Sequence, residues 1–369
     1  MTVVNGYEQS DREEHINVLN LESLEKRAKE IIPTGGFGYI VGGSEDDWTL
    51  AQNRKAFTHK QIYPRTLANI DNPDMSTNVF GIDLKTPVMM APLAAQGLAH
   101  SKGEVDTAKA FANEGALMAQ STYSSASIAD TAAAGEGAPQ FFQLYMSKDW
   151  KFNEAILDEA KKAGVKGIIL TADATVDGYR EADIINDFQF PIPMANLEKF
   201  SEGAGKGQGI AEIYAAAAQK ISPDDVRRIA EYSDLPVIVK GIQTPEDAEL
   251  AIGAGAAGIY VSNHGGRQLN GGPASFDALS AIADSVAGRV PIIFDSGVRR
   301  GSDVFKALAA GADLVALGRP FVYALALGGA LGVQDAIQEL NHEFATTMQL
   351  AGTKTIDEVK QSKLADFKY

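Results

Sequence analysis

The chain has 369 residues, of which 45% are apolar and 22% charged, and its formal net charge at pH 7 is −15. Such an acidic surface repels nucleic acids and anionic membranes, so neither is expected as a partner. The absence of cysteine excludes disulfides, thiolate metal sites, iron–sulfur clusters and thiol nucleophiles. The first residues lack the pattern of a signal peptide, and the longest near-apolar stretch, residues 321–333, is too short to cross a bilayer. We therefore expect a soluble, cytoplasmic globular protein.

The N-terminal part is expected to lie outside the main repeat of elements. Residues 1–20 are polar and acidic without periodicity, and predict a loose arm. Residues 21–31 and 44–57 have helical spacing on either side of a glycine-rich break at residues 33–38. A single domain is expected over residues 21–369, since no low-complexity linker marks a second one.

Eight short apolar runs then recur along the chain. Each has four to seven residues, and such runs are typical of strands buried on both faces of a parallel sheet. They lie at residues 87–91, 116–120, 139–145, 167–172, 236–240, 258–262, 291–294 and 313–317.

Helix signals occupy the segments between these runs. Ser222 and Thr244 each precede a proline and stand three residues before an acidic side chain, a pattern typical of helix N-termini. Residues 302–310 form an amphipathic pattern that ends at Gly311. The alternation predicts an α/β protein with a (β/α)8 TIM barrel over about residues 80–330. A doubly wound open sheet is the competing architecture.

One connection is much longer than a βα unit requires. About sixty residues separate Asp173 from Pro236, and residues 201–209 in its middle include four glycines. Long loops in compact domains are often lids, so a lid is expected over about residues 178–220. An inert surface insertion is the alternative.

Polar residues lie at the C-terminal end of almost every predicted strand or just after it. A barrel enzyme carries its chemistry at the C-terminal ends of its strands, so these residues are the candidates for a site. They are Ser121, Gln143, Tyr145, Thr171, Asp173, Lys240, His264, Arg267, Asp295, Arg299 and Arg319.

The ends of the last two predicted strands favour a phosphate site. Gly297 and Gly318 allow backbone N–H groups to approach an anion, and each loop opens a helix whose positive end faces the same place. Turn chemistry alone would explain these glycines, but it does not explain the neighbouring Arg299 and Arg319.

His264 is the candidate general base, because it stands at a strand terminus before two glycines and an arginine. Asp173 is placed to hold the imidazole and raise its pKa, while a purely structural histidine is the alternative. No histidine spacing typical of metal sites occurs, so no metal is expected. Lys240 could form a Schiff base, bind a phosphate or stabilise a developing anion, and spacing does not choose between these roles. Arg180 and Arg267 could bind a carboxylate together, or each could form an ion pair at the surface.

Residues 262–268, Ser-Asn-His-Gly-Gly-Arg-Gln, resemble the active-site signature of the FMN-dependent α-hydroxy-acid oxidase family. Two departures from many members are Ser296, where glycine is common, and the segment around Phe190 and Tyr214. Both are closest to the bacterial lactate-oxidising members. Supporting motifs follow in the family's order at residues 91–96, 143–145, 171–173, 239–241, 295–301 and 318–320.

The resemblance implies a bound FMN and a small hydroxy-acid substrate. The implied substrate-binding residues are Tyr39, Tyr145, Arg180, Tyr214, His264 and Arg267. The implied FMN-binding residues are Pro92, Leu93 and Ala94 along the flavin near N5; Ser121, Gln143 and Thr171 at its polar edge; Lys240 at N1 and O2; Ser262; and Asp295, Ser296, Gly297, Arg299, Gly318 and Arg319 at the ribityl phosphate.

The implied reaction is the oxidation of an L-2-hydroxy acid, L-lactate above all, by O2 to pyruvate and hydrogen peroxide. His264, Asp173 and Tyr145 are the implied catalytic residues: His264 takes the hydroxyl proton and Asp173 stabilises the imidazolium. The α-hydrogen leaves with two electrons toward flavin N5, as a hydride or through a carbanion. A homotetramer is implied as well. The alternatives are a glycolate or long-chain hydroxy-acid oxidase, a quinone- or cytochrome-linked lactate or mandelate dehydrogenase, and a non-catalytic flavin- or phosphate-binding barrel.

Overall fold

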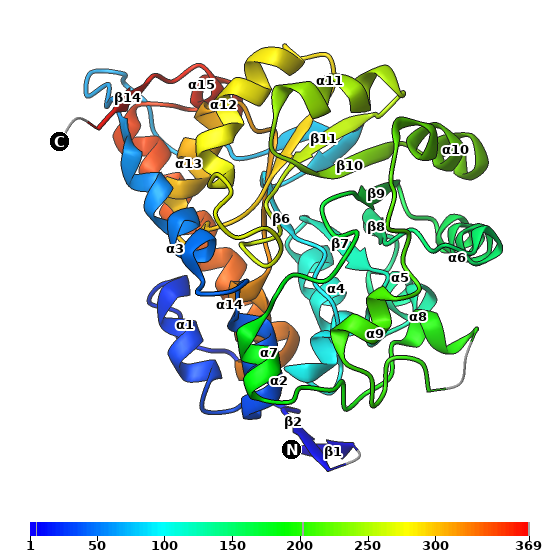
Figure 1. Cartoon of the computed structure of the whole chain (residues 1–369). Helices are drawn as coiled ribbons and strands as arrows, with labels where there is room; N and C mark the ends of the chain where they lie inside the picture. Colours follow the sequence, from blue (N-terminus) through cyan, green and yellow to red (C-terminus); the bar gives the residue numbers. More distant parts are fainter. Residues whose placement is uncertain (5, 201–202, 368–369) are drawn as a thin grey trace.

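Eight parallel strands close into a barrel in the computed structural model, which describes residues 1–4, 6–200 and 203–367 (Figure 1). Around the barrel the strands follow each other in chain order, and each overlaps one of the eight predicted runs, so the predicted TIM barrel is confirmed. The strands are β6 (Val88–Met90), β7 (Leu117–Ser121), β8 (Gln140–Leu144), β9 (Gly167–Thr171), β10 (Val237–Ile242), β11 (Gly258–Val261), β12 (Ile292–Phe294) and β13 (Leu314–Leu317).

The interior of the barrel is filled, and its N-terminal end is closed by a hairpin of β4 (Thr77–Val79) and β5 (Ile82–Leu84). At the tip of this hairpin the Phe80 ring packs edge-on against Phe141 at 5.5 Å between centroids. A ligand can therefore approach only the C-terminal end. The inward-facing buried side chains are Met89, Ala91, Leu117, Ala119, Phe141, Ile169, Ile238, Tyr260, Ile293, Leu314 and Ala316.

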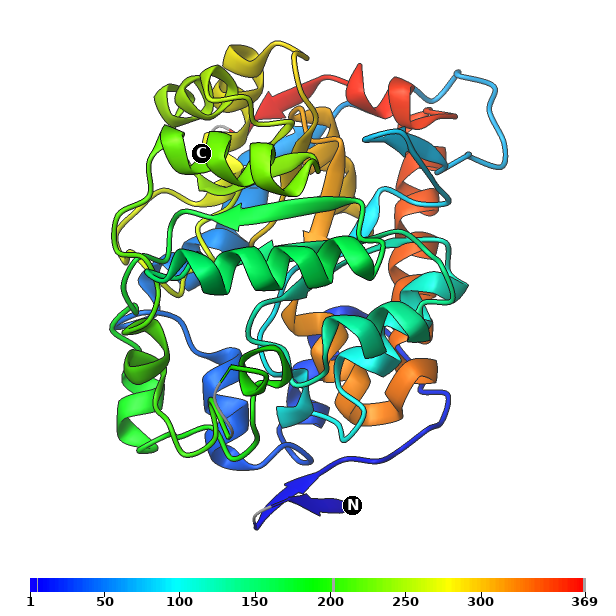
Figure 2. The same ribbon diagram turned by 90° about the vertical axis from the view of Figure 1, so that its right-hand side faces the viewer.

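Helices surround the barrel and return the chain from each strand to the next (Figure 2). The predicted N-caps are present: the Ser222 N–H donates to the Asp225 carboxylate at 2.7 Å, and the Asp247 N–H donates to Thr244 Oγ1 at 3.2 Å. The helices are α4 (Glu104–Asn113), α5 (Ile128–Ala134), α6 (Trp150–Lys162), α10 (Pro223–Ser233), α11 (Pro245–Gly253), α12 (Ser275–Val286), α13 (Gly301–Ala309) and α14 (Arg319–Ala351).

Helix α14 contains the near-apolar stretch of the sequence and kinks at Gly328 and Gly329. A Cβ on Gly328 would lie 2.3 Å from the carbonyl oxygen of Glu14, so the N-terminal segment passes too close for a side chain. By length and composition α14 could cross a membrane, but 83% of its apolar window is buried inside the protein. Its packing in the core accounts for its apolar composition.

The N-terminal segment is more ordered than the loose arm predicted for residues 1–20. Strands β1 (Thr2–Val4) and β2 (Tyr7–Gln9) form an antiparallel hairpin, visible at the lower edge of Figure 2. The Tyr7 hydroxyl donates to the Leu98 carbonyl at 2.8 Å, and Gln9 Nε2 donates to the Gly97 carbonyl at 2.6 Å. These contacts reach the short helix η2 (Gln96–Leu98), far away in sequence, so local periodicity could not reveal them.

The glycine-rich break predicted at residues 33–38 is instead the start of a helix. It belongs to α2 (Thr34–Val41), which lies between α1 (Leu21–Ala28) and α3 (Trp48–Lys55) in the chain. A Cβ on Gly36 would lie 1.9 Å from the Tyr7 hydroxyl, and one on Gly38 would lie 2.7 Å from the Asn186 amide nitrogen. These glycines therefore allow close packing against two other segments rather than interrupting the helix.

The long connection after β9 folds over the C-terminal end of the barrel. It carries α7 (Glu181–Ile185), α8 (Ala195–Glu198) and α9 (Ile210–Tyr214), and Phe190 and Met194 within it are fully buried. Residues 201–202 of its predicted glycine-rich stretch lie outside the described residues. The remaining elements are η1 (Ala56–His59), β3 (Lys60–Ile62), α15 (Ile356–Lys360) and β14 (Leu364–Asp366), with β3 and β14 paired.

Candidate active site

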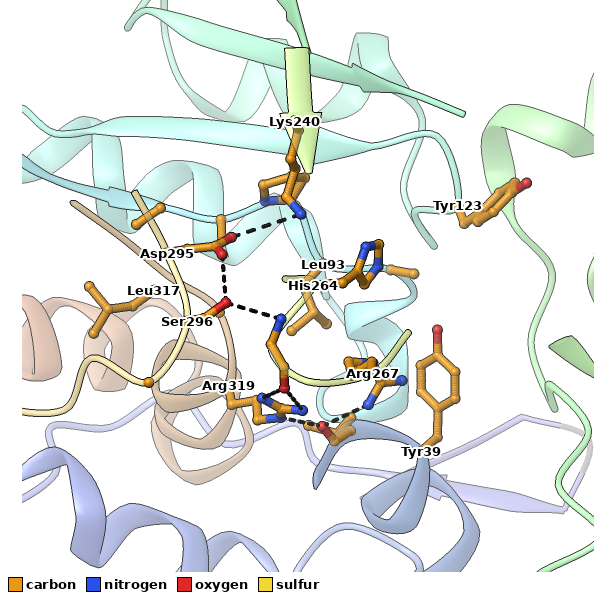
Figure 3. A pocket seen from close by; sticks show the side chains of 18 of the residues that line it. Tyr39, Leu93, Tyr123, Lys240, His264, Arg267, Asp295, Ser296, Leu317 and Arg319 are labelled. Carbon is orange, nitrogen blue, oxygen red and sulfur yellow. Dashed lines mark hydrogen bonds and ion pairs between the residues drawn. The ribbon is translucent and has the colours of Figure 1, made fainter. Parts of the chain in front are cut away.

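A cavity of about 860 Å³, counting its open mouth, lies at the C-terminal end of the barrel (Figure 3). Its size is typical of a small-molecule site. Most of the predicted site residues line it together: Tyr39, Pro92, Leu93, Ala94, Tyr145, Arg180, Tyr214, Lys240, His264, Arg267, Asp295, Ser296, Gly297, Arg299, Gly318 and Arg319.

His264 is held at both ring nitrogens. Its Nδ1 lies 3.0 Å from Asp173 Oδ1, and its Nε2 lies 3.2 Å from the Tyr145 hydroxyl. The carboxylate partner assigns the imidazole proton to Nδ1, so Nε2 carries the lone pair and accepts from Tyr145. The atom that would act as the base therefore faces the cavity, with Asp173 behind the ring.

The pKa values of both residues are lowered, and this keeps the pair in the charge state that a base requires. Burial lowers the pKa of His264, with Asp173 opposing the shift and Lys240 adding to it. Burial alone would raise the pKa of Asp173, but the charges of His264 and Lys240 outweigh it and lower that pKa. The resting pair is an ionised Asp173 beside a neutral imidazole.

Two arginines and a tyrosine form the part of the cavity suited to a carboxylate. The guanidinium carbons of Arg180 and Arg267 lie 5.7 Å and 4.9 Å from the Tyr39 ring centroid, and Figure 3 shows Arg267 beside Tyr39. Arg180 donates to Gln268 at 3.1 Å through Nη2, but its Nε and Nη1 are buried without a partner. These unpartnered buried donors are available to a carboxylate oxygen.

Polar side chains link the ends of three neighbouring strands beside the cavity. The Ser121 hydroxyl donates to Gln143 Oε1 at 2.9 Å, and Gln143 Nε2 donates to Thr171 Oγ1 at 2.8 Å. All three are buried, so the strand ends present a fixed set of donors and acceptors. This arrangement is able to meet the polar edge of a planar ring.

Lys240 brings a buried positive charge to the ends of β10 and β11. Its Nζ donates to Ser262 Oγ at 3.0 Å and lies 3.9 Å from Asp295 Oδ2. Ser296 donates to Asp295 at 2.9 Å and accepts from the Gly265 N–H at 3.1 Å, as the dashed lines in Figure 3 show. These bonds tie the loops after β11 and β12 together beneath the cavity.

A cluster of partly buried arginines lines the cavity on the side away from Lys240. Arg319 donates to the carbonyls of Ile40, Gly42 and Gly265 at 3.0–3.1 Å, and Arg267 donates to Gly42 at 2.6 Å. Burial and the charge of Arg267 lower the pKa of Arg319 to about 9. Such crowded positive charge favours binding of an anion.

The end of helix α2 explains part of this arrangement. Its last carbonyls carry the negative end of the helix dipole, which attracts the two guanidinium groups. The sequence did not predict this helix, so it could not predict the backbone partners of Arg267 and Arg319. Gly297 also has to be a glycine for a packing reason: its φ is +85°, and a Cβ there would lie 2.2 Å from the Asn53 carbonyl of α3.

The residues present fit FMN. A planar ring needs a polar edge with a positive charge beside it, which Gln143 and Lys240 offer, and an apolar wall, which Pro92 and Leu93 offer. A ribityl phosphate needs cationic donors, and the arginine cluster stands at the other end of the same cavity. Among the described residues no group of three or more possible metal ligands occurs.

Some residues of the cavity were missed from the sequence. The most prominent is Tyr123, whose ring stacks on Tyr145 at 4.5 Å and lies 6.0 Å from Tyr214. It follows β7 by two residues, so its place after a predicted strand was the available signal. Ile40 and Ile210 line the cavity from helices that the sequence did not predict.

Residues 28–366 match the family model described as FMN-dependent dehydrogenase, so the chain belongs to this family of proteins, whose cofactor is FMN. Among its relatives, an L-lactate oxidase of Lentilactobacillus hilgardii is 74% identical over 369 residues and covers 100% of both chains. An L-lactate oxidase of Streptococcus iniae is 48% identical, with 97% of this chain and 88% of that protein covered. A glycolate oxidase of Spinacia oleracea is 41% identical, with 95% and 96% covered.

Solved structures agree with these relatives. A refolded lactate oxidase of Pediococcus acidilactici has a TM-score of 0.96 with 72% identity, and 100% of each chain is covered. A mandelate oxidase has a TM-score of 0.89 with 32% identity, and 96% of this chain and 100% of that chain are covered. The predicted family and FMN dependence are confirmed.

Proposed function

We propose that the protein oxidises L-lactate with O2 to pyruvate and hydrogen peroxide. The observation that carries this proposal is that one cavity holds both the basic Nε2 of His264, with the Tyr145 hydroxyl beside it, and the unpartnered donors of Arg180. His264 Nε2 can accept the hydroxyl proton of a 2-hydroxy acid, and the Arg180 donors can bind its carboxylate. The 74% identity to an L-lactate oxidase supports the choice of substrate and acceptor.

Each residue has a distinct task in this reaction. Arg180 and Arg267 bind and orient the carboxylate, and His264 Nε2 receives the hydroxyl proton while Asp173 stabilises the imidazolium. Lactate also loses its α-hydrogen with two electrons, and O2 gains two electrons and two protons. FMN supplies the electron acceptor, which no side chain provides. Tyr145 holds the hydroxyl against His264.

We propose that FMN is held by the residues that the sequence assigned to it. Pro92, Leu93 and Ala94 would hold its ring, and Ser121, Gln143, Thr171 and Lys240 would bind the polar edge of that ring, with Ser262 orienting Lys240. The residues that would hold the phosphate are Asp295, Ser296, Gly297, Arg299, Gly318 and Arg319. The partly buried arginine cluster and the fixed hydrogen bonds at the strand ends support this placement.

A small substrate side chain is favoured by the aromatic wall. The rings of Tyr123 and Tyr214 lie 4.5 Å and 5.6 Å from that of Tyr145, which leaves little room beside His264. Oxygen uptake by the holoprotein with L-lactate, glycolate and mandelate tests the assignment, with lactate expected to be fastest. Faster turnover of mandelate, or electron transfer to a quinone without oxygen uptake, would contradict it.

We further propose that residues 178–220 act as a lid, and that the protein works in the cytoplasm as a homotetramer. The buried contacts of Phe190 and Tyr214 support a closed position of the lid over the cavity. Light scattering tests the assembly: a homotetramer has four times the chain mass of 39.2 kDa. A mass equal to one chain at micromolar concentration would contradict it.

A further inference from the structure

A second cavity lies on the outer side of the arginine cluster. It measures about 790 Å³, counting its opening, and shares Arg299 and Arg319 with the active-site cavity. These two arginines therefore stand between the two cavities. The other walls come from α1, α3 and the end of α2, which gather along one side of the barrel in Figure 1. They are Glu22, Glu25, Val41, Asp47, Leu50, Ala51 and Arg54.

Apart from Arg299 and Arg319, the walls of this outer cavity carry three acids, Glu22, Glu25 and Asp47, against one cation, Arg54, so their net charge is negative. Arg54 donates to Glu22 at 2.5 Å and to Asp303 at 3.0 Å. Glu25 accepts a hydrogen bond from the Tyr323 hydroxyl at 3.3 Å. Glu25 lines this cavity together with Arg299 and Arg319. Burial lowers the pKa of both arginines, and the negative charge of Glu25 opposes that shift.

Flavin cofactors differ in structure beyond their first phosphate. FMN ends in a phosphate monoester, whereas FAD continues through a second phosphate to an adenosine. If the FMN phosphate is held between Arg299 and Arg319, any continuation must enter the outer cavity. The cavity is of a size that holds small ligands, so size alone does not exclude a nucleotide there.

We propose that Glu22 and Glu25 make the site selective for FMN, because their carboxylates repel the second phosphate of a flavin dinucleotide. Like charges brought together in this way cost enough free energy to reject a partner. The proposal rests on the proposed placement of the FMN phosphate at Arg299 and Arg319. It assigns to the N-terminal helix α1 a role in cofactor recognition from outside the barrel.

Fluorescence titrations of the apoprotein with riboflavin, FMN and FAD test this proposal. The wild type should bind FAD at least about a hundredfold more weakly than FMN, as like-charge repulsion predicts. Glu22→Gln and Glu25→Gln should each reduce the ratio of the FAD Kd to the FMN Kd. The double variant should reduce this ratio at least about tenfold, because it binds FAD more tightly. Glu30→Gln, an exposed acid just after α1, is the matched control and should leave the ratio unchanged.

The outcomes separate the proposal from the placement on which it rests. Equal affinity of the wild type for FMN and FAD, or an unchanged ratio in both single variants that still bind FMN, overturns the role of Glu22 and Glu25. Equal affinity for FMN and riboflavin instead shows that no phosphate is held at Arg299 and Arg319, and the placement itself fails. Raising the salt concentration should also bring the wild-type Kd values for FMN and FAD closer together, because salt screens this repulsion.

Discussion

The backbone of His264 is left-handed, with φ of +61°, a conformation that residues other than glycine rarely adopt. Its N–H donates to Ser262 Oγ at 3.0 Å, and its ring contacts Asp173 and Tyr145 on opposite sides. Backbone strain of this kind persists only where the surroundings hold the residue, and it gathers at functional sites. The strain here aims Nε2 into the cavity.

Replacing His264 by glutamine tests its role as the base. The variant should retain FMN, because His264 belongs to the substrate end, but lactate should reduce the flavin at least about 10²-fold more slowly, the usual contribution of a general base. Anaerobic stopped-flow absorbance measures this rate. A near-normal rate with bound FMN would remove His264 from the mechanism.

The acid limb of the activity profile depends on the pKa of His264. Because burial lowers this pKa, the imidazole stays neutral below its ordinary titration range, and kcat/KM should fall only as the pH drops below about 6.5. Asp173 opposes the shift, so Asp173→Asn should move the limb to still lower pH while reducing the maximal rate. Steady-state oxygen uptake between pH 5 and 8 measures both. A limb centred above pH 6.5 would contradict the assignment.

Replacement by lysine should affect Arg180 more than Arg267. Arg180 has two unpartnered buried donors, whereas Arg267 already donates to the Gly42 carbonyl. An ammonium cannot reproduce a bidentate fork, so Arg180→Lys should raise the KM for lactate by about tenfold or more and exceed the effect of Arg267→Lys. Arg227→Lys, at an exposed ion pair on α10, is the control. The reverse order of KM values would assign the carboxylate to Arg267 instead.

The site residues on strand ends could be predicted, and those on helices could not. His264, Lys240 and Asp173 follow buried strands, so the barrel rule alone marks them. Tyr39 was found only through the family resemblance, because it lies on α2, directly after the residues that were taken for a break. Tyr123 was missed because a tyrosine beside a strand end is usually a packing residue.

At the level of elements, local signals succeed where a segment follows its own periodicity. The barrel strands and the capped helices α10 and α11 depend on short-range patterns, and the structure confirms them. The N-terminal hairpin and α2 depend on each other and on η2, through contacts such as that between Tyr7 and Leu98. Contacts between distant segments leave no periodic signal, so they could not be predicted.

The proposed lid, residues 178–220, should control how fast pyruvate leaves the site. Across this segment the Gly207 N–H donates to the Phe190 carbonyl and the Phe190 N–H donates to the Gln208 carbonyl. The Tyr214 ring packs on Tyr145. Tyr214→Phe removes only the hydroxyl, so it should alter pyruvate release more than FMN affinity. Pyruvate should also protect residues 200–210 from proteolysis. Equal cleavage with and without pyruvate, together with unchanged kinetics, would make the segment an inert insertion.

At the scale of the whole molecule, the barrel brings together charges that the chain keeps far apart in sequence. Arg267, Arg299 and Arg319 come from three successive loops and are packed into one end of a cavity within a chain of net charge −15. Burying like charges without a partner destabilises a fold. Binding of an anion there should therefore contribute to folding as well as to catalysis.

Removing FMN should accordingly lower the unfolding temperature. FMN at a hundred times its Kd contributes about 2.7 kcal/mol to the free energy of unfolding by mass action. The phosphate part of this effect arises from relief of the crowded charge that lowers the pKa of Arg319. Inorganic phosphate should therefore raise the melting temperature of the apoprotein more than chloride at the same ionic strength, and it should have little effect on the holoprotein. Calorimetric scans of both forms measure these shifts, and an equal response of apoprotein and holoprotein to phosphate would show that the arginine cluster is not where the anion binds.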